Sequence, residues 1–488
     1  MRSPVAILSS LALLAGLAGT AVLPAQAATP TLDWQACTAP HLDGFDCATL
    51  ERPLDRDRPD GAKVQLAVVR LPATGTPEQR IGSLFMNPGG PGGSGLAAAR
   101  LGYLLPAEVR TAFDFVTWDP RGIGSSTPKI SGCSAPMPTR PATGPVNWQR
   151  VLKVRLRELG RINRACYAAN RSIIEHSGTL DGAYDLDALR AAVGDDRITY
   201  WGISYGTMLG STYAQLFPDR VRALVFDGNM DPQTTFAALN AGSTAPDHSI
   251  GFFLETLSLD DSFTQALAEL DRRTLALPDG TTYTRWDLLD VVAGSAPSLM
   301  AWSVTQAAIE GSWIALFGSG DLQQEALDAL TNPALRSPVT DANAGVFSAI
   351  LCQDFADRMN LDQMRQGLRW AVREGTLYGG SLSVDYLASC QGYGDAKPDP
   401  VPRPATYGPD VPGLIANATR DGMTPYQWAV NMARVYRAMR MVTIASGSHG
   451  VFVLGESPCL DGIVTDYLVS ADVPPIDQVC PFSPPAPT

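Results

Sequence analysis

Residues Arg197 to Gly206 read RITYWGISYG, an apolar run that passes into a glycine–X–serine–X–glycine motif. The aromatic and β-branched residues before Ser204 predict a buried strand, and the residues after it have the pattern of a helix. Where a strand turns sharply into a helix at such a motif, the serine hydroxyl stands above the carboxyl end of the sheet. The motif therefore predicts a nucleophile at Ser204. A tight strand-to-helix turn without chemistry is the alternative.

The rest of the chain repeats this alternation of short apolar runs and helical segments. Such alternation predicts an α/β fold with a mostly parallel central sheet covered by helices on both faces. The expected strands are residues 64–71, 81–87, 113–118, 197–203, 222–226, 413–416 and 441–445.

A long helical insertion interrupts the α/β pattern. It ends in the run KPDPVPRPATYGPDVPG, whose six prolines exclude regular structure and predict a connection back to the sheet. We expect a first core segment over residues 28–232, a helical cap over 233–405 and a C-terminal core segment over 406–488.

The first residues predict a signal peptide over residues 1–27. Arg2 precedes an apolar stretch, and Ala25-Gln26-Ala27 resembles a cleavage site. An uncleaved anchor is the alternative. Cleavage would remove Arg2 and no acid, which changes the formal net charge from −12 to −13. That balance argues against nucleic acid and anionic membrane as partners, because both require basic patches.

The chain has eight cysteines and no C-x-x-C motif or Cys/His cluster. In an exported protein such cysteines indicate disulfides rather than metal ligands. Eight cysteines allow 105 pairings. If closeness in sequence governs, the pairs are Cys37 with Cys47, Cys133 with Cys166, Cys352 with Cys390, and Cys459 with Cys480.

A serine nucleophile needs a base, and the chain has four histidines. The base of such a site comes last in chain order, on a loop after the final strand. Only His449, in MVTIASGSHGV, satisfies that condition. The other three suit surface or core positions.

The third member of such a site orients the imidazole and offsets its positive charge. Asp421 follows the strand GLIA and lies between Ser204 and His449 in order. Asp227, in LVFDGNMDP, is the rival position, although its carboxylate could instead stabilise its own Asp-Gly turn. Thr424 is expected to cap the helix that begins at the proline after it.

The run MNPGGPGGSG, residues 86–95, allows two interpretations. Its glycines fit the G-x-G-x-x-G spacing of a dinucleotide site, but Pro91 has no N–H to offer a phosphate oxygen. We favour an oxyanion hole, in which the N–H of Gly90 and that of Tyr205 stabilise a tetrahedral intermediate.

With these residues assigned, the chain resembles the secreted tripeptidyl aminopeptidases, a branch of the α/β-hydrolase peptidases that includes the proline iminopeptidases. The resemblance rests on NPGGPGGSG, WDPRGIGSS, YDLDALRAAVG, YWGISYGTMLGSTYAQLFPDRV, LVFDGNMDP, ATRDGMTP and GSHG, in that order. It implies an α/β-hydrolase fold, Ser204 as nucleophile, Asp421 as acid and His449 as base, with no metal or organic cofactor. It also implies an acidic group in the cap that pairs with a substrate α-amine. Asp354, in AILCQDF, is the candidate for that role, although we favour a solvated carboxylate on a helix face at this position.

The leading hypothesis is an exported serine exopeptidase that releases short peptides from the free N-termini of peptides or small unfolded proteins. A carboxylic-ester hydrolase with the same three residues is the first alternative, because the cap selects the leaving group. A non-catalytic binding module on the same fold is the second. The residues do not indicate an oligomeric state.

Overall fold

The computed structural model describes residues 31–483 except 337–339, 342–343, 395–397 and 405. The predicted signal peptide lies outside the described residues. In the described part, no helix is long and apolar enough to cross a membrane.

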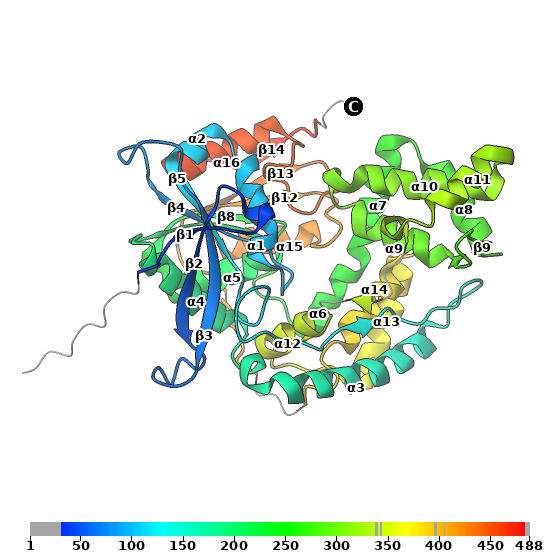
Figure 1. The fold of residues 1–488 in the computed structure, drawn as a ribbon, viewed down its shortest axis with the longest axis horizontal. Coiled ribbons are helices and arrows are strands. Elements are labelled where there is room, and N and C mark those ends of the chain that lie inside the picture. Colours follow the sequence, from blue (N-terminus) through cyan, green and yellow to red (C-terminus); the bar gives the residue numbers. More distant parts are fainter. Residues whose placement is uncertain (1–30, 337–339, 342–343, 395–397, 405, 484–488) are drawn as a thin grey trace, which may run out of the picture.

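A ten-stranded sheet forms the centre of the molecule, with the order β1-β2-β3-β5-β4-β7-β8-β12-β13-β14 (Figure 1). Seven strands, from β5 to β14 in that order, run parallel to one another, and the first three pair antiparallel. The strands are β1 (Gln35–Ala36), β2 (Asp46–Pro53), β3 (Lys63–Leu71), β4 (Gly82–Asn87), β5 (Phe113–Trp118), β7 (Ile198–Ile203), β8 (Val221–Asp227), β12 (Gly413–Ala418), β13 (Met439–Ile444) and β14 (Gln478–Cys480). The predicted α/β fold with a mostly parallel sheet is confirmed. Strands β1, β2 and β14 were not predicted.

Successive side chains of the central strands enter two different cores. Phe85 and Tyr200 pack on one face, whereas Leu84 and Trp201 pack on the other. Helices α4 (Thr179–Ala192), α5 (Tyr205–Leu216) and α15 (Tyr426–Val435) cover the first face, and α2 (Ala107–Ala112) and α16 (Pro458–Ser470) cover the second (Figure 1). Burial on both faces explains why these strands have continuous apolar runs rather than alternating ones.

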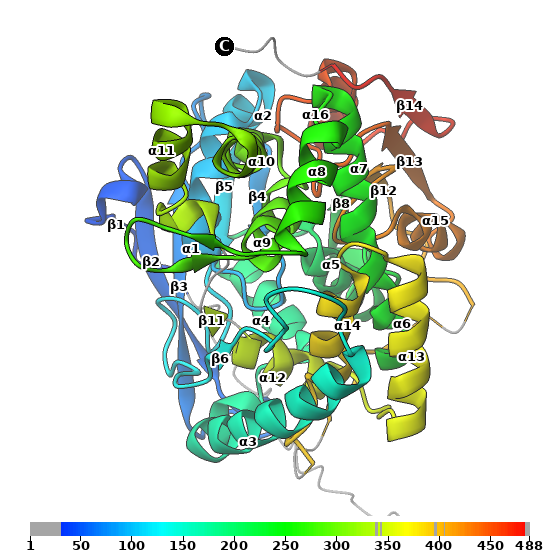
Figure 2. The ribbon, with the colours of Figure 1, turned by 90° about the vertical axis from the view of Figure 1, so that its right-hand side faces the viewer.

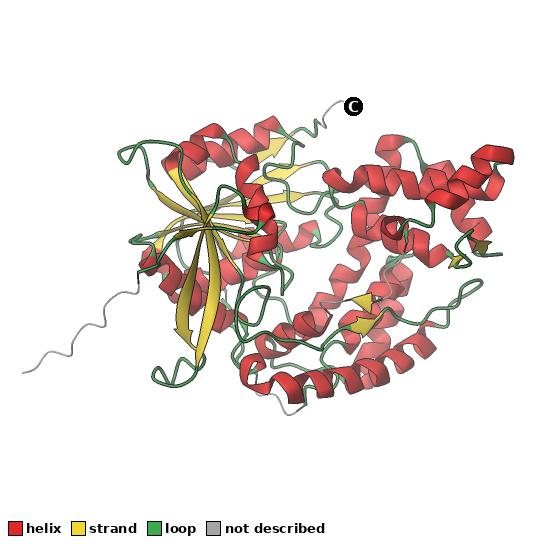
Figure 3. Cartoon of the chain, viewed as in Figure 1, coloured by secondary structure: helices red, strands yellow, loops and turns green. Residues whose placement is uncertain are grey.

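The connection between β8 and β12 forms a helical cap with a core of its own. Phe253, Leu289 and Ile309 belong to that separate core. Figure 3 shows that the cap is nearly all helix, while the long strands are confined to the other half of the molecule. The cap helices are α6 (Phe236–Leu239), α7 (Ala245–Leu257), α8 (Asp260–Leu270), α9 (Arg285–Ser295), α10 (Trp302–Phe317), α11 (Gly320–Ala329), α12 (Ala344–Asp354), α13 (Leu361–Glu374) and α14 (Gly379–Ala388).

Helix α3 (Trp148–Ile174) belongs to the cap in space, although it precedes β7 in sequence. It contacts α12, α13 and α14 (Figure 2). The expected boundary at residue 233 therefore separates core from cap only along the sequence. In space, the earlier helix α3 also forms the underside of the cap.

Four disulfides are present, and each joins two cysteines that follow one another along the chain with no other cysteine between them. One of them ties the cap helix α12 to the segment after α14, and another ties α16 to β14. The pairs are Cys37–Cys47, Cys133–Cys166, Cys352–Cys390 and Cys459–Cys480. These are the same pairs that closeness in sequence predicts.

Candidate active site

Ser204 occupies the sharp turn between β7 and α5. Its backbone has φ 58° and ψ −126°, a conformation that non-glycine residues rarely adopt and that costs on the order of 1–3 kcal/mol. A Cβ on Gly202 would lie 2.5 Å from the carbonyl oxygen of Gly206, and a Cβ on Gly206 would lie 2.6 Å from that of Asn87. The two glycines of the motif are therefore required by close backbone approach on both sides of the serine.

Asp421 and His449 lie on loops that follow β12 and β13. The Nδ1 atom of His449 is 3.0 Å from each carboxylate oxygen of Asp421. The N–H groups of Met423 and Thr424 each donate to Oδ1 of Asp421 at 2.8 Å, and the hydroxyl of Thr424 donates to Oδ2 at 2.9 Å. These three donors hold the buried carboxylate in place beside the imidazole.

The predicted cap at Thr424 is wrong. Helix α15 begins at Tyr426 with no side-chain cap, because the hydroxyl of Thr424 is engaged by Asp421 and also lies 3.3 Å from Nδ1 of His449. The local capping preference of Thr424 is overridden by its contacts with Asp421 and His449.

The pKa of His449 is affected by two opposing influences. Burial lowers it, because a buried imidazolium loses its hydration. The negative charge of Asp421 and its hydrogen bond raise the pKa, with a smaller contribution from Asp227, and the net result is a pKa above the ordinary 6.5.

Asp227, the rival position for the acid, is also fully buried but has other partners. Its carboxylate accepts the N–H of Val451 at 2.9 Å, the N–H of Phe452 at 3.1 Å and the indole N–H of Trp201 at 3.4 Å. Burial raises the pKa of Asp227 to about 6, although the hydrogen bonds from these three donors lower it. Asp227 thus holds the loop that carries His449, whereas the direct contact to the imidazole comes from Asp421.

Several contacts bring the His449 loop and Ser204 to the same edge of the sheet. A Cβ on Gly228 would lie 3.1 Å from the imidazole of His449, and a Cβ on Gly450 would lie 3.3 Å from the side chain of Ile203, the neighbour of Ser204. Ser204 also lines a cavity with Thr424, the residue bonded to Asp421. The three predicted residues therefore lie at the same carboxyl edge of the sheet.

The glycine turn after β4 lies directly against this serine. A Cβ on Gly89 would be 2.4 Å from the carbonyl oxygen of Ile203 and 3.0 Å from the amide nitrogen of Tyr205. Gly89 and Gly90 have φ values of 89° and 111°, which only glycine adopts without strain. The N–H groups of Gly90 and Tyr205 have no acceptor among the described backbone groups.

The cavity above Ser204 is small and mainly apolar. Its volume is about 70 Å³, below the ~300 Å³ at the low end for ligand sites. Gly90, Pro91 and Tyr205 line it on the core side. The cap contributes Leu239, Phe347, Leu351 and Tyr386. Side chains of the cap therefore lie over the serine and leave only this small cavity between cap and core.

Asp354 lies at the end of α12 and is fully buried. The expectation of a solvated helix-face carboxylate is thus wrong. Its Oδ1 accepts the N–H of Thr179 at 2.7 Å and its Oδ2 accepts the hydroxyl of Thr179 at 2.6 Å, with the hydroxyl of Tyr205 at 3.5 Å. Burial raises the pKa of Asp354 to about 6, while these bonds and the charge of Arg403 lower it. Asp354 is not part of the lining of the cavity above Ser204.

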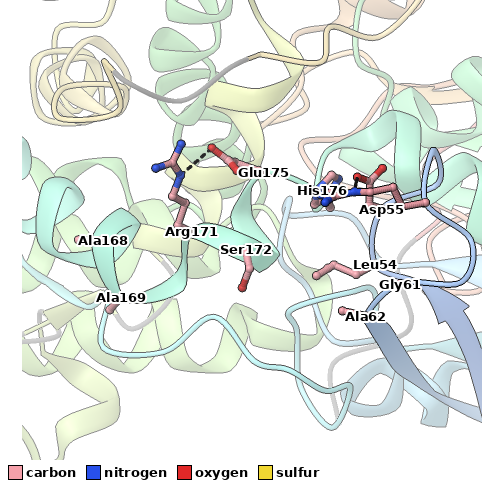
Figure 4. Close-up of a pocket in the computed structure, with 11 residues that line it drawn as sticks. Leu54, Asp55, Gly61, Ala62, Ala168, Ala169, Arg171, Ser172, Glu175 and His176 are labelled. Carbon is pink, nitrogen blue, oxygen red and sulfur yellow. Dashed lines mark hydrogen bonds and ion pairs between the residues drawn. The ribbon is translucent and has the colours of Figure 1, made fainter.

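A larger hollow of about 510 Å³ lies elsewhere, between the loop after β2 and the end of α3 (Figure 4). Its charged groups pair with one another: Arg171 with Glu175 at 3.0 Å and Arg58 with Asp55 at 2.6 Å. It contains none of the residues proposed for chemistry, so volume alone does not identify the site.

Comparisons with known proteins agree with the α/β-hydrolase fold. A profile described as alpha/beta hydrolase fold matches residues 82–278, and one described as TAP-like protein matches residues 377–480. Serine protease Hip1 of Mycobacterium bovis is 32% identical over 92% of this chain and 91% of its own. A tripeptidyl aminopeptidase of Streptomyces coelicolor is 30% identical over 96% and 90%, and Carboxylesterase B of Mycobacterium tuberculosis is 28% identical over 92% and 90%.

The fold and these matches define a serine hydrolase of the α/β-hydrolase class. The chain belongs to the TAP-like family within that class.

Proposed function

We propose that this protein is an exported serine exopeptidase that releases short peptides, such as tripeptides, from free N-termini. The observation that carries the proposal is the 3.0 Å contact between Asp421 and His449 at the sheet edge where Ser204 occupies its strained turn. This combination provides a nucleophile, a base and a group that orients the base.

In the proposed reaction, Oγ of Ser204 attacks the carbonyl carbon of the scissile bond as Nε2 of His449 takes the hydroxyl proton. The N–H groups of Gly90 and Tyr205 stabilise the resulting oxyanion. His449 then gives the proton to the leaving amine, and an acyl group remains on Ser204. In the second half of the reaction, water attacks the acyl-enzyme while His449 takes its proton. His449 returns that proton to Oγ of Ser204, and the peptide is released.

The exopeptidase assignment is supported by the relatives and by the cap. Two of the relatives are a serine protease and a tripeptidyl aminopeptidase. The cap, which we assign to residues 233–405, closes over Ser204 and leaves little room for a folded chain. Such a closed site favours the ends of short or unfolded substrates.

A carboxylic-ester hydrolase is the second candidate. The cavity is mainly apolar, and one relative is a carboxylesterase. The same three residues attack esters and amides, so the distinction depends on what the cap recognises.

Export is supported by the predicted signal peptide and by the four disulfides, since disulfides persist in oxidising compartments. After the signal peptide has been removed, we expect the protein to bind a peptide substrate and neither nucleic acid nor membrane.

Rates on matched substrates test the proposal. We would compare a tripeptidyl anilide with a free α-amine, its N-acetyl form, and an ester of the same acyl group. An exopeptidase should cleave the free-amine anilide with a much higher kcat/KM than the N-acetyl anilide. Equal rates on the free and acetylated anilides would contradict recognition of the N-terminus, and hydrolysis of the ester alone would favour the second candidate.

A further inference from the structure

Asp354 connects the cap to the turn that carries Ser204. It is the last residue of cap helix α12, and its carboxylate reaches two core elements. The N–H and hydroxyl of Thr179, the first residue of α4, donate to it at 2.7 and 2.6 Å. The hydroxyl of Tyr205, the first residue of α5, lies 3.5 Å from the same carboxylate and bonds the hydroxyl of Thr179.

This carboxylate replaces a missing helix cap. Gly178 precedes α4 and has no side chain to accept the free N–H groups of the first turn. The carboxylate of Asp354 accepts one of these N–H groups from another part of the chain. It also brings a negative charge to the positive end of the helix dipole, which is a favourable position for an anion.

Tyr205 has two separate functions in this arrangement. Its backbone N–H is one of the two donors that we assign to the oxyanion hole. Its side chain is buried, and the phenol hydroxyl has hydrogen bonds only to Thr179 and Asp354 among the described residues. The phenol of the residue that supplies this N–H is thus held by one residue of α4 and one of the cap.

The same face of α12 lines the cavity above Ser204. Phe347 and Leu351 contribute to the cavity wall, and Asp354 follows them at the i, i+4, i+7 spacing that places side chains on one face of a helix. The disulfide between Cys352 and Cys390 fixes this helix to the segment just after α14. A shift of α12 would thus change the cavity wall and the support of Tyr205 together.

We infer that Asp354 is a positioning residue that couples the seating of the cap to the oxyanion hole through Thr179 and Tyr205. The inference rests on the proposed role of Tyr205 in the reaction. It differs from an α-amine partner, which would have to face the substrate. A carboxylate that holds Tyr205 affects the chemical step for any acyl substrate, whereas an α-amine partner affects only substrates with a free amine.

The test compares two substitutions with a matched control. Asp354→Asn keeps the shape but weakens the acceptor, and Tyr205→Phe removes the phenol hydroxyl while keeping the backbone N–H. Asp247→Asn is the control, because Asp247 is another cap carboxylate that accepts two N–H groups, those of Leu377 and Tyr378, within the cap. Each variant is assayed on the free-amine anilide, the acetylated anilide and the ester, and with a peptidyl boronate inhibitor whose oxygen occupies the oxyanion hole.

We expect each of the two substitutions to lower kcat about tenfold and to change KM less than about twofold, on every substrate that the wild type cleaves. The reason is that a displaced oxyanion-hole donor reduces stabilisation of the transition state and not binding of the substrate. Boronate inhibition should weaken by a similar factor. The double substitution should cost little more than either single one, because both act on one network. Asp247→Asn should stay within about twofold of the wild type in kcat.

Other results would overturn the inference. An unchanged kcat in a folded Asp354→Asn or Tyr205→Phe variant would contradict the coupling between the cap and the oxyanion hole. If Asp354→Asn does not fold, the kcat of Tyr205→Phe alone tests the inference. A rise in KM confined to the free-amine anilide would assign Asp354 to the substrate amine instead. A wild type that cleaves only the ester would contradict the exopeptidase proposal, yet the same comparison on the ester would still test the role of Asp354.

Discussion

The carbonyl oxygen of Asp227 accepts the backbone N–H of Ser204 at 2.8 Å. The carboxylate of the same aspartate accepts N–H groups of Val451 and Phe452, just after His449. One residue at the end of β8 thus holds both the turn with the proposed nucleophile and the loop with the proposed base. It supports the site without contacting the reacting atoms.

We expect Asp227→Ala to lower the free energy of unfolding by about 1–3 kcal/mol, because it leaves buried N–H groups without an acceptor. The rate should also fall by about tenfold or more, since misplacement of catalytic groups is costly. Asp461→Ala is a useful comparison, as the one hydrogen bond that the Asp461 carboxylate accepts within the described part of the chain comes from the N–H of Val453, further along that loop. Urea unfolding and kcat measured on both variants check this, and an equal loss of rate in the two would contradict the special role of Asp227.

Asp421→Asn should reduce kcat by about 10⁴-fold while the protein remains folded, because an amide cannot stabilise the imidazolium and favours the wrong tautomer. Steady-state kinetics with circular dichroism as the folding control test this. A loss smaller than that of Asp227→Ala would reverse the assignment of the two aspartates.

Ser204→Ala should abolish labelling by a fluorophosphonate probe and nearly all hydrolysis. The wild type should be labelled stoichiometrically, as measured by intact mass. A wild type that is not labelled would favour a binding module, and a labelled Ser204→Ala variant would place the nucleophile elsewhere.

The rate should fall on acidification with a midpoint above pH 6.5, because the general base must be neutral and Asp421 raises the pKa of His449. A raised pKa in the folded state also means that the stability from this pair is full below the ordinary value and is lost as the pH rises through the folded value. The pH profile of kcat/KM reports the free enzyme. A profile that stays flat from pH 5 to 8 would exclude His449 as the base.

Gly89→Ala should inactivate the protein, because the new Cβ would lie 2.4 Å from the carbonyl oxygen of Ile203 and 2.8 Å from the Cβ of Ser204. Gly251→Ala is the matched control, since nothing lies within 4 Å of its added Cβ. Activity of both variants, normalised to folded protein, would test whether the glycine turn must approach the serine.

Much of the fold could be predicted because its signals are local. The central strands are apolar runs ended by proline or glycine, and β7 with its motif specifies the turn at Ser204. The predicted bounds of β4 and β5 differ from the observed ones by at most one residue. Strand β14 was missed because three residues, partly exposed, provide no periodic pattern.

The partners of individual polar side chains could not be predicted in the same way. Thr424 precedes a proline and has the local features of a helix cap, yet it bonds Asp421. Asp354 has the local features of a solvated helix residue, yet it is buried against Thr179, 175 positions away in sequence. The Asp-x-x-Thr spacing at Asp421 was the one signal from which the Thr424 contact could have been inferred.

By itself, the sequence determined the strand–turn–helix at Ser204, the chain order of the proposed catalytic residues and the presence of a helical cap, because backbone sterics and hydrophobic periodicity act over a few residues. Only the tertiary structure decided which aspartate meets His449, that α3 joins the cap, and that Asp354 caps α4 from a distance. These outcomes depend on contacts between segments far apart in the chain, where a buried carboxylate must find donors wherever the packing supplies them.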